Sequence, residues 1–184
     1  QLVDAVGPAR ILPTNIALND EQLETFMDDH SHDIDEALSQ AAIDYLSSVP
    51  VNTVCKFLRS NGVPDACLES ISSFEVEDFE GIEDLSVISN TRIEEAGILF
   101  MCEFELRTVI WTVSVPTSMY VANITSFDAH FMNAEAGADG QTTMEAIQRI
   151  CFEAKLIFDR ASDDFEETRI TMTGVIPPRG SRST

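Results

Sequence analysis

Two histidines and several carboxylates lie close together in the segment FMDDHSHDIDEAL, residues 26–38. Histidine and carboxylate side chains ligate divalent metals and transfer protons near neutral pH. On a continuous helix, Asp29, His32 and Glu36 share one face because they are three and four residues apart, and Asp33 lies beside them. This spacing predicts a candidate metal site, and with it one hypothesis for the function, a metal-assisted hydrolase.

The same spacing also fits a solvated helix face, which is the interpretation that we favour. Charged runs of this kind are usually solvent-exposed. The sequence contains no HExxH motif, EF-hand loop or second histidine-bearing helix to complete a metal site. His30 falls on the apolar stripe of Phe26, Met27 and Ile34, which predicts a packed histidine at the boundary of the core. The favoured interpretation therefore implies no cofactor, and the alternative implies a divalent metal.

A second polar cluster is predicted on one face of the strands in the second half of the chain. A histidine next to an aspartate in such a cluster is an acid–base candidate. The alternative is a solvated sheet face with cross-strand pairs of glutamate with lysine or arginine, and this is the interpretation that we favour. In either case the cluster forms a candidate interaction face. Its residues are Glu103, Glu105, Asp128, His130 and Glu153, with Lys155 beside them.

Helical signals dominate the first third of the chain. Asn19 is a good N-cap, and apolar residues with helical spacing follow it, which predicts one long helix over 20–48. A break near Ser31, with a second helix starting there, is the alternative. The segment VNTVCKFLRSNGVP, residues 51–64, predicts a further helix that stops at Asn61-Gly62.

Strand signals follow from residue 73. Apolar and polar residues alternate in the runs 98–115, 123–132, 149–158 and 168–178, and turn-forming residues separate these runs. Beyond Thr108 the alternation changes parity, which predicts an inserted residue, hence a bulge or a turn. Strands with one apolar and one polar face are typical of an antiparallel sheet that is exposed to water on one side.

The order of these signals predicts an α+β fold, with an N-terminal helical segment packed on a mostly antiparallel β-sheet. We expect an irregular segment over 1–18, a helical segment over 19–72, a sheet region over 73–178 that packs with it as one domain, and a disordered tail over 179–184.

Acidic residues outnumber basic ones by 32 to 11, for a formal net charge of −21. Such a chain repels nucleic-acid phosphates and anionic membranes, so we expect no direct binding to either. Three interpretations of the charge remain open: an ordinary acidic surface, which we favour, adaptation to high salt, and mimicry of a phosphate backbone that blocks a nucleic-acid-binding protein.

The four cysteines form no CxxC pair and have no zinc-type spacing. Cys102 and Cys151 fall within apolar runs, so buried free thiols and a reducing, cytoplasmic location are expected. The start, QLVDAVGPARILP, has neither the basic nor the apolar region of a signal peptide, and no stretch is apolar enough to span a bilayer. Because the chain begins without methionine, we expect it to be trimmed or part of a longer protein.

One arrangement resembles a known family. A helical segment from Asp20 to Ser60 precedes the acidic stretch IEDLSVISNTRIEEAG, residues 82–97, and long strands over 98–115 and 149–158. This order, over roughly residues 19–176, resembles the β-rich accessory region that follows the nuclease core in some large PIN-like proteins. The resemblance implies an accessory part of a larger protein. The PIN core itself is missing, so no catalytic residue is carried over.

The leading functional hypothesis is a non-enzymatic, acidic accessory module that binds a protein partner. The polar face is the expected contact if that partner is basic. The first alternative is an acidic inhibitor that mimics nucleic acid and occupies the DNA or RNA site of another protein. The second is the metal-assisted hydrolase that uses Asp29, His32, Asp33 or Glu36.

Overall fold

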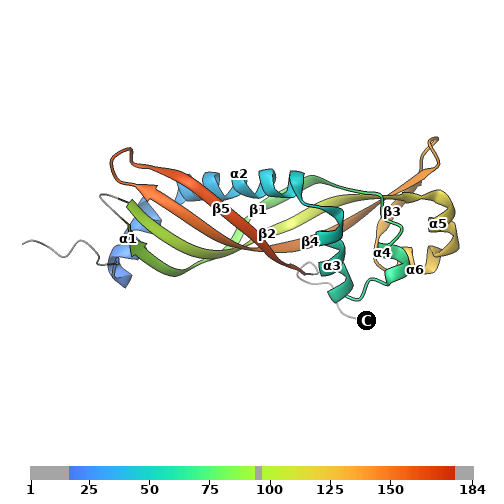
Figure 1. Ribbon diagram of the computed structural model, residues 1–184, viewed down its shortest axis with the longest axis horizontal. Coiled ribbons are helices and arrows are strands. Elements are labelled where there is room, and N and C mark those ends of the chain that lie inside the picture. Colours follow the sequence, from blue (N-terminus) through green and yellow to red (C-terminus); the bar gives the residue numbers. More distant parts are fainter. Residues whose placement is uncertain (1–16, 94–96, 177–184) are drawn as a thin grey trace, which may run out of the picture.

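The computed structural model describes residues 17–93 and 97–176. Long, twisted strands run along the molecule, with helices over one face and at one end (Figure 1). Residues 179–184, predicted as a disordered tail, and most of the irregular segment predicted for 1–18 lie outside the described residues. None of the helices in the described ranges has the length and apolar character needed to cross a bilayer.

The first two helices meet at a break. Helix α1 (Asp20–Asp29) starts with a capping box between Asn19 and Gln22, and α2 (Ser31–Ser48) follows after His30. The continuous helix predicted for 20–48 is therefore wrong, and the alternative break near Ser31 is confirmed. The break lets α1 and α2 pack independently on the sheet. The buried stripe of α2 consists of Ile34, Leu38, Ala42 and Leu46.

Two shorter helices complete the helical segment. Helix α3 (Val51–Ser60) ends just before Gly62, and α4 (Asp65–Leu68) follows Pro64. Gly62 has a φ of 89°, a left-handed conformation that glycine adopts without steric cost. The predicted stop at Asn61-Gly62 is therefore confirmed.

The sheet is antiparallel throughout. Its strands are β1 (Ser73–Arg92), β2 (Gly97–Pro116), β3 (Met132–Ala136), β4 (Gln141–Asp159) and β5 (Asp164–Ile176). The order is β1-β2-β4, and β4 then pairs with β3 near its start and with β5 along the rest of its length. The predicted α+β class is confirmed.

The predicted change of parity in β2 is a β-bulge. The register with β4 shifts between Leu106 and Val109, so the buried set changes from even to odd residue numbers there. Thr108, within the bulge, has a φ of 49°. A positive φ is unusual for a β-branched residue and strains the backbone.

The strain at Thr108 gives a testable expectation. Thr108→Gly should raise the free energy of unfolding by about 0.5–1 kcal/mol, because glycine adopts this conformation without strain. The gain is partly offset by the loss of the exposed hydrogen bond from Thr108 Oγ1 to Glu80 Oε2, 3.0 Å long. Urea unfolding measures the difference. Thr108→Val, which keeps the strain and loses the hydroxyl, should lower stability, and a less stable glycine variant would contradict the account.

The core lies between the helices and one face of the sheet. On β2 and β4 the buried side chains alternate along each strand, and helix α2 packs against β1 and β5, on either side of this pair. The rings of Phe104 and Phe152 stack with their centroids 5.2 Å apart. Tyr45 of α2 meets Phe152 edge to face at 5.8 Å, so aromatic contacts join the helix to the sheet.

The strand predicted for 123–132 is wrong except at its last residue. Pro116 ends β2, and two short helices follow, α5 (Thr117–Ala122) and α6 (Ile124–Asp128). The aromatic rings of Tyr120, Phe127 and Phe131 contact one another in sequence, with centroids 5.8 and 6.1 Å apart. Tyr120 lies in α5, Phe127 in α6 and Phe131 just after α6, so the short alternation that suggested a strand falls on a helix and the turn after it.

Candidate functional site

The predicted metal-ligating residues lie on both sides of the helix break. Asp29 ends α1, whereas His32, Asp33 and Glu36 belong to the start of α2, and all four side chains are exposed. Over residues 17–93 and 97–176, no group of three or more histidine, cysteine, aspartate or glutamate side chains is arranged to hold a metal ion. The structure therefore does not bring these four residues together as a set of ligands.

His30 has the role that its apolar neighbours predicted. Its ring lies 4.5 Å from that of Phe26 and 4.8 Å from that of Phe158, measured between centroids. Its Nδ1 is 3.7 Å from Asp33 Oδ2, at the edge of an ion-pair distance. His30 is thus a packed histidine at the boundary of the core, as predicted.

The second predicted cluster does not exist as one face. Glu103 and Glu153 are directly opposite each other on β2 and β4, and Glu105 is opposite Cys151. Asp128 and His130 instead lie in and after α6, beyond the end of β2. Met132, two residues after His130, pairs with Glu145 of β4, which in turn pairs with Thr112 of β2, nine residues or about 30 Å from Glu103 along the strand. The grouping was wrong because the segment assigned to a strand is helical.

The outer face of the sheet carries cross-strand ion pairs, as the alternative interpretation predicted. Arg149 Nη1 is 2.7 Å from Glu105 Oε2, and Arg107 pairs with both Glu80 and Glu83 of β1, at 3.1 and 2.9 Å. A shallow hollow of about 360 Å³ lies next to Glu105. Arg149 thus pairs with a carboxylate that lines the hollow, as expected for a polar sheet face with cross-strand ion pairs.

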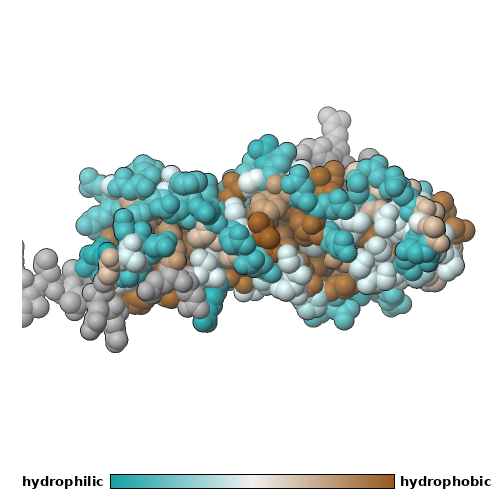
Figure 2. Space-filling model, turned by 90° about the horizontal axis from the view of Figure 1, so that it is seen from above, coloured by the Kyte–Doolittle hydropathy of each residue, from teal (hydrophilic) through white to brown (hydrophobic). Residues whose placement is uncertain are grey.

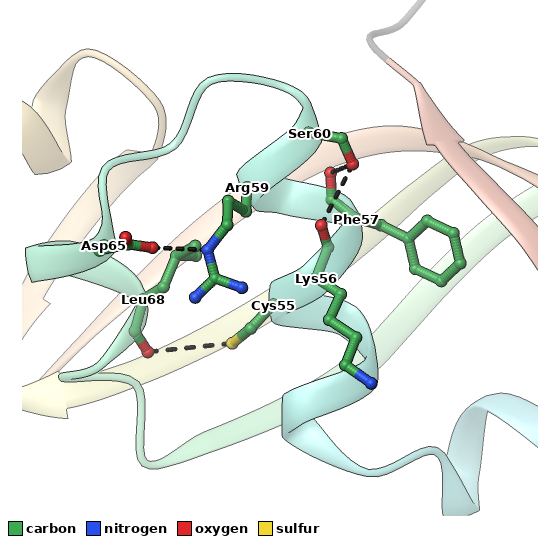
Figure 3. A network of polar contacts seen from close by, with 7 residues as sticks. All are labelled: Cys55, Lys56, Phe57, Arg59, Ser60, Asp65 and Leu68. Carbon is green, nitrogen blue, oxygen red and sulfur yellow. Dashed lines mark hydrogen bonds and ion pairs between the residues drawn. The ribbon is translucent and has the colours of Figure 1, made fainter.

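The cysteines are free and shielded from solvent. Cys55, Cys67 and Cys102 are buried and Cys151 is half-buried, and burial raises the pKa of each thiol above its ordinary value. In Figure 3, Cys55 points from α3 toward α4, where its Sγ donates a weak hydrogen bond to the Leu68 carbonyl, 3.8 Å away. A thiol with a raised pKa is a poor nucleophile at neutral pH.

Cys102 makes stability depend on pH in alkaline solution. Burial raises its pKa from 9.0 to about 11. Between these two values the unfolded thiol releases its proton and the folded thiol keeps it, so stability falls as pH rises, by about 1.4 kcal/mol per pH unit. Cys102→Ala should show a shallower decline of the free energy of unfolding as pH rises from 9 toward 11. Equal slopes for the two proteins would contradict this assignment.

An open groove with a mixed polar and apolar lining runs between α2 and β5. It has a volume of about 540 Å³. Among the described strands, β5 pairs only with β4, so its outer edge borders this groove. Small side chains on α2 keep the groove open, and aromatic and aliphatic side chains form much of its wall. The lining residues are Ala37, Gln40, Ala41, Asp44, Tyr45, Ser48, Phe165, Thr168 and Ile170.

Helix α2, which lines the groove, and the preceding α1 contain many carboxylates and no lysine or arginine. Residues 17–48 contain nine carboxylates and no lysine or arginine. Seen from the α2 side, the surface is mostly hydrophilic, with apolar side chains gathered near its middle (Figure 2). The nine carboxylates, all exposed, are Asp20, Glu21, Glu24, Asp28, Asp29, Asp33, Asp35, Glu36 and Asp44.

A second, smaller groove lies on the other side of α2. Its volume is about 230 Å³, and Ile43 and Leu46 of α2 face Val76 and Phe79 of β1 across it. Ile43 is 42 % exposed, which is high for a large aliphatic side chain on a helix that packs on a sheet. Helix α2 therefore lies between two grooves that expose apolar side chains, and its own solvent-exposed face carries carboxylates.

Sequence reasoning missed the groove, because its walls come from segments more than 100 residues apart, α2 and β5. One signal was available in the sequence: the described part of the chain contains no lysine or arginine before Lys56. Comparisons with protein-family models, with curated proteins and with solved structures found no match. The resemblance to the accessory region of PIN-like proteins therefore stays a prediction.

Proposed function

We propose that this chain is a non-enzymatic interaction module that binds a basic protein partner through α1, α2 and the groove between α2 and β5. The observation that carries the proposal is an open, partly apolar groove along α2, together with the nine exposed carboxylates of α1 and α2, which contain no lysine or arginine. Apolar side chains of the partner would occupy the groove, and its lysines and arginines would meet the carboxylates.

The carboxylates and the apolar side chains of the groove would contribute to binding in different ways. Exposed carboxylates attract a basic partner over a distance and orient it, and this contribution weakens with salt. Tyr45, Phe165 and Ile170 offer apolar surface whose burial is much less sensitive to salt. The proposed complex should therefore form fastest at low salt and should persist, more weakly, at high salt. The free thiols support a reducing, cytoplasmic location for it.

A nucleic-acid-mimicking inhibitor is a second candidate, favoured by the same nine carboxylates. In that case the basic surface of the partner is its DNA or RNA site. Duplex DNA would then compete with this chain for the partner, whereas an accessory module would leave nucleic-acid binding unchanged. A competition experiment with a labelled duplex separates the two once a partner is known.

The proposal is tested by capturing proteins from a native lysate on the immobilised chain at low and at high salt, with identification by mass spectrometry. The expected result is a basic protein that binds at low salt and is retained in part at high salt. Capture of only neutral or acidic proteins would overturn the proposal. Complete release of the basic protein by salt would favour the inhibitor, because it leaves no role for the apolar groove.

A further inference from the structure

Three of the described strands, β1, β3 and β5, pair with a neighbour on one side only. The edge of β1 is irregular, because its register with β2 shifts five times along 20 residues. Strand β3 has only 5 residues. Strand β5, by contrast, keeps an unbroken register with β4 over six consecutive residues, 167–172. Bulges and short length protect an edge from pairing with another chain, so β5 has the least protected edge of the three.

The regular part of this edge coincides with the groove of the proposed binding site. Thr168 and Ile170 of β5 line the groove. The wall on α2 from Ala37 to Ser48 and the wall on β5 from Phe165 to Ile170 are each about 17 Å long, at rises of about 1.5 and 3.3 Å per residue. The two walls thus match in length, and the groove fits an extended segment of about five residues.

The wall on α2 carries negative charge. Glu36, Gln40 and Asp44 follow one another at intervals of four residues on one side of the helix, all three are exposed, and the last two line the groove. Helix α2 contains four carboxylates and no lysine or arginine. A second copy of this chain is therefore disfavoured here, because pairing two β5 edges would bring two such helices to the same contact. The charge favours a basic segment instead.

We infer that the partner binds as an extended segment that adds a strand to β5, an inference that rests on the proposed function. Backbone hydrogen bonds to the free edge hold the segment, and every second side chain points into the groove. There, apolar side chains meet Tyr45 and Ile170, and a lysine or arginine meets Asp44. On the opposite face the segment lies beside Arg169, which is in register with Lys155 of β4, so uncharged side chains are expected at those positions.

Binding of a synthetic peptide to the full chain tests this inference. The probe has about eight residues and alternates threonine with lysine or valine, so that one face of the strand matches the groove. Hydrogen exchange followed by NMR should slow at least about tenfold at every second backbone amide in 167–172, because the amides between them already bond to β4.

Two further peptides separate strand pairing from other ways of filling the groove. One is an isomer of the probe with its valines at helical spacing. The other is the probe with N-methyl groups on its two central backbone nitrogens, which block one edge of the strand each. Each should bind at least about tenfold more weakly than the probe, because neither can form the full ladder of backbone hydrogen bonds.

Two substitutions on α2 provide a matched pair of variants. Asp44→Asn should weaken binding of the probe about threefold, because it removes an exposed charge that lines the groove. Asp35→Asn removes the same charge about two and a half helical turns away, on the opposite side of α2, and should leave binding unchanged. Equal losses for the two variants would contradict the placement of the lysine beside Asp44.

Equal binding of the probe and its N-methylated copy, tighter binding of the helical isomer, or no binding of any peptide at about 1 mM would overturn the inference. Protection of 167–172 that grows with the concentration of the chain alone would assign the edge to a second copy and would also overturn it. The proposed function survives each of these results if the lysate still yields a basic protein, so the two failures are distinguishable.

Discussion

Replacing Phe152 by alanine should lower the free energy of unfolding by about 3–5 kcal/mol. Phe152 is 1 % exposed and stacks on Phe104, and Tyr45 of α2 packs against its edge. The substitution leaves a cavity between α2 and the sheet. It removes the ring contact with Phe104 on β2 and the ring contact with Tyr45 on α2. Urea unfolding followed by circular dichroism measures the loss, which is a large part of the stability of an ordinary domain.

A matched substitution separates this effect from the general cost of removing a hydrophobic side chain. Ile88→Ala removes apolar atoms from a side chain that is 57 % exposed, so it should change stability by no more than about 0.5 kcal/mol. If Phe152→Ala were equally mild, α2 would not be held to the sheet by these aromatic contacts. The groove beside α2 would then lack the fixed wall that the proposed function needs.

The second large effect is expected when the acidic charge on α2 is removed. The triple variant Asp33→Asn, Glu36→Gln, Asp44→Asn should bind the basic partner about 10- to 100-fold more weakly at low salt. All three carboxylates are exposed on α2, and Asp44 also lines the groove. Most of the loss should appear in the association rate, because exposed charges steer the approach of a partner. Titration calorimetry and stopped-flow mixing measure the two quantities.

The control for this variant removes the same net charge elsewhere. Glu69→Gln, Glu135→Gln, Asp139→Asn changes three exposed carboxylates near the other end of the sheet, after α4, on β3 and in the turn before β4. It should weaken binding by less than threefold, because exposed charges beyond a Debye length are largely screened. Equal losses for the two triple variants would mean that overall charge, and not α2, attracts the partner.

The fold could largely be predicted from the sequence, because local patterns specify it. The period-two alternation of β2 and its change of parity after Thr108 identified both a long strand and its bulge. The segment after Pro116 was mistaken because the five alternating residues 127–131 suggested a strand, although Phe127 and Phe131 are also four residues apart, as on a helix. Short alternation fits a strand and a surface helix equally well, so only the longer period distinguishes them.

The candidate site was much harder to predict. Asp29 and His32 looked like neighbours on one helix, and the break at His30 separated them into two helices. A break of one residue depends on tertiary contacts, here between His30 and Phe158, which lie 128 positions apart. Likewise, Tyr45 and Phe165 form one groove only because β5 returns beside α2. Local sequence patterns contain no information about such distant pairs.

The central claim is that a basic partner binds in the groove between α2 and β5, and site-specific photo-crosslinking tests it most directly. A photoreactive phenylalanine analogue is placed at Gln40, which lines the groove, and in a second protein at Glu135 on β3, which pairs with the far end of β4. We predict that a basic protein from the native lysate crosslinks at position 40 and not at position 135, and that salt reduces its yield. Crosslinks at 135 alone, or none at 40 while the partner still binds, would contradict the claim.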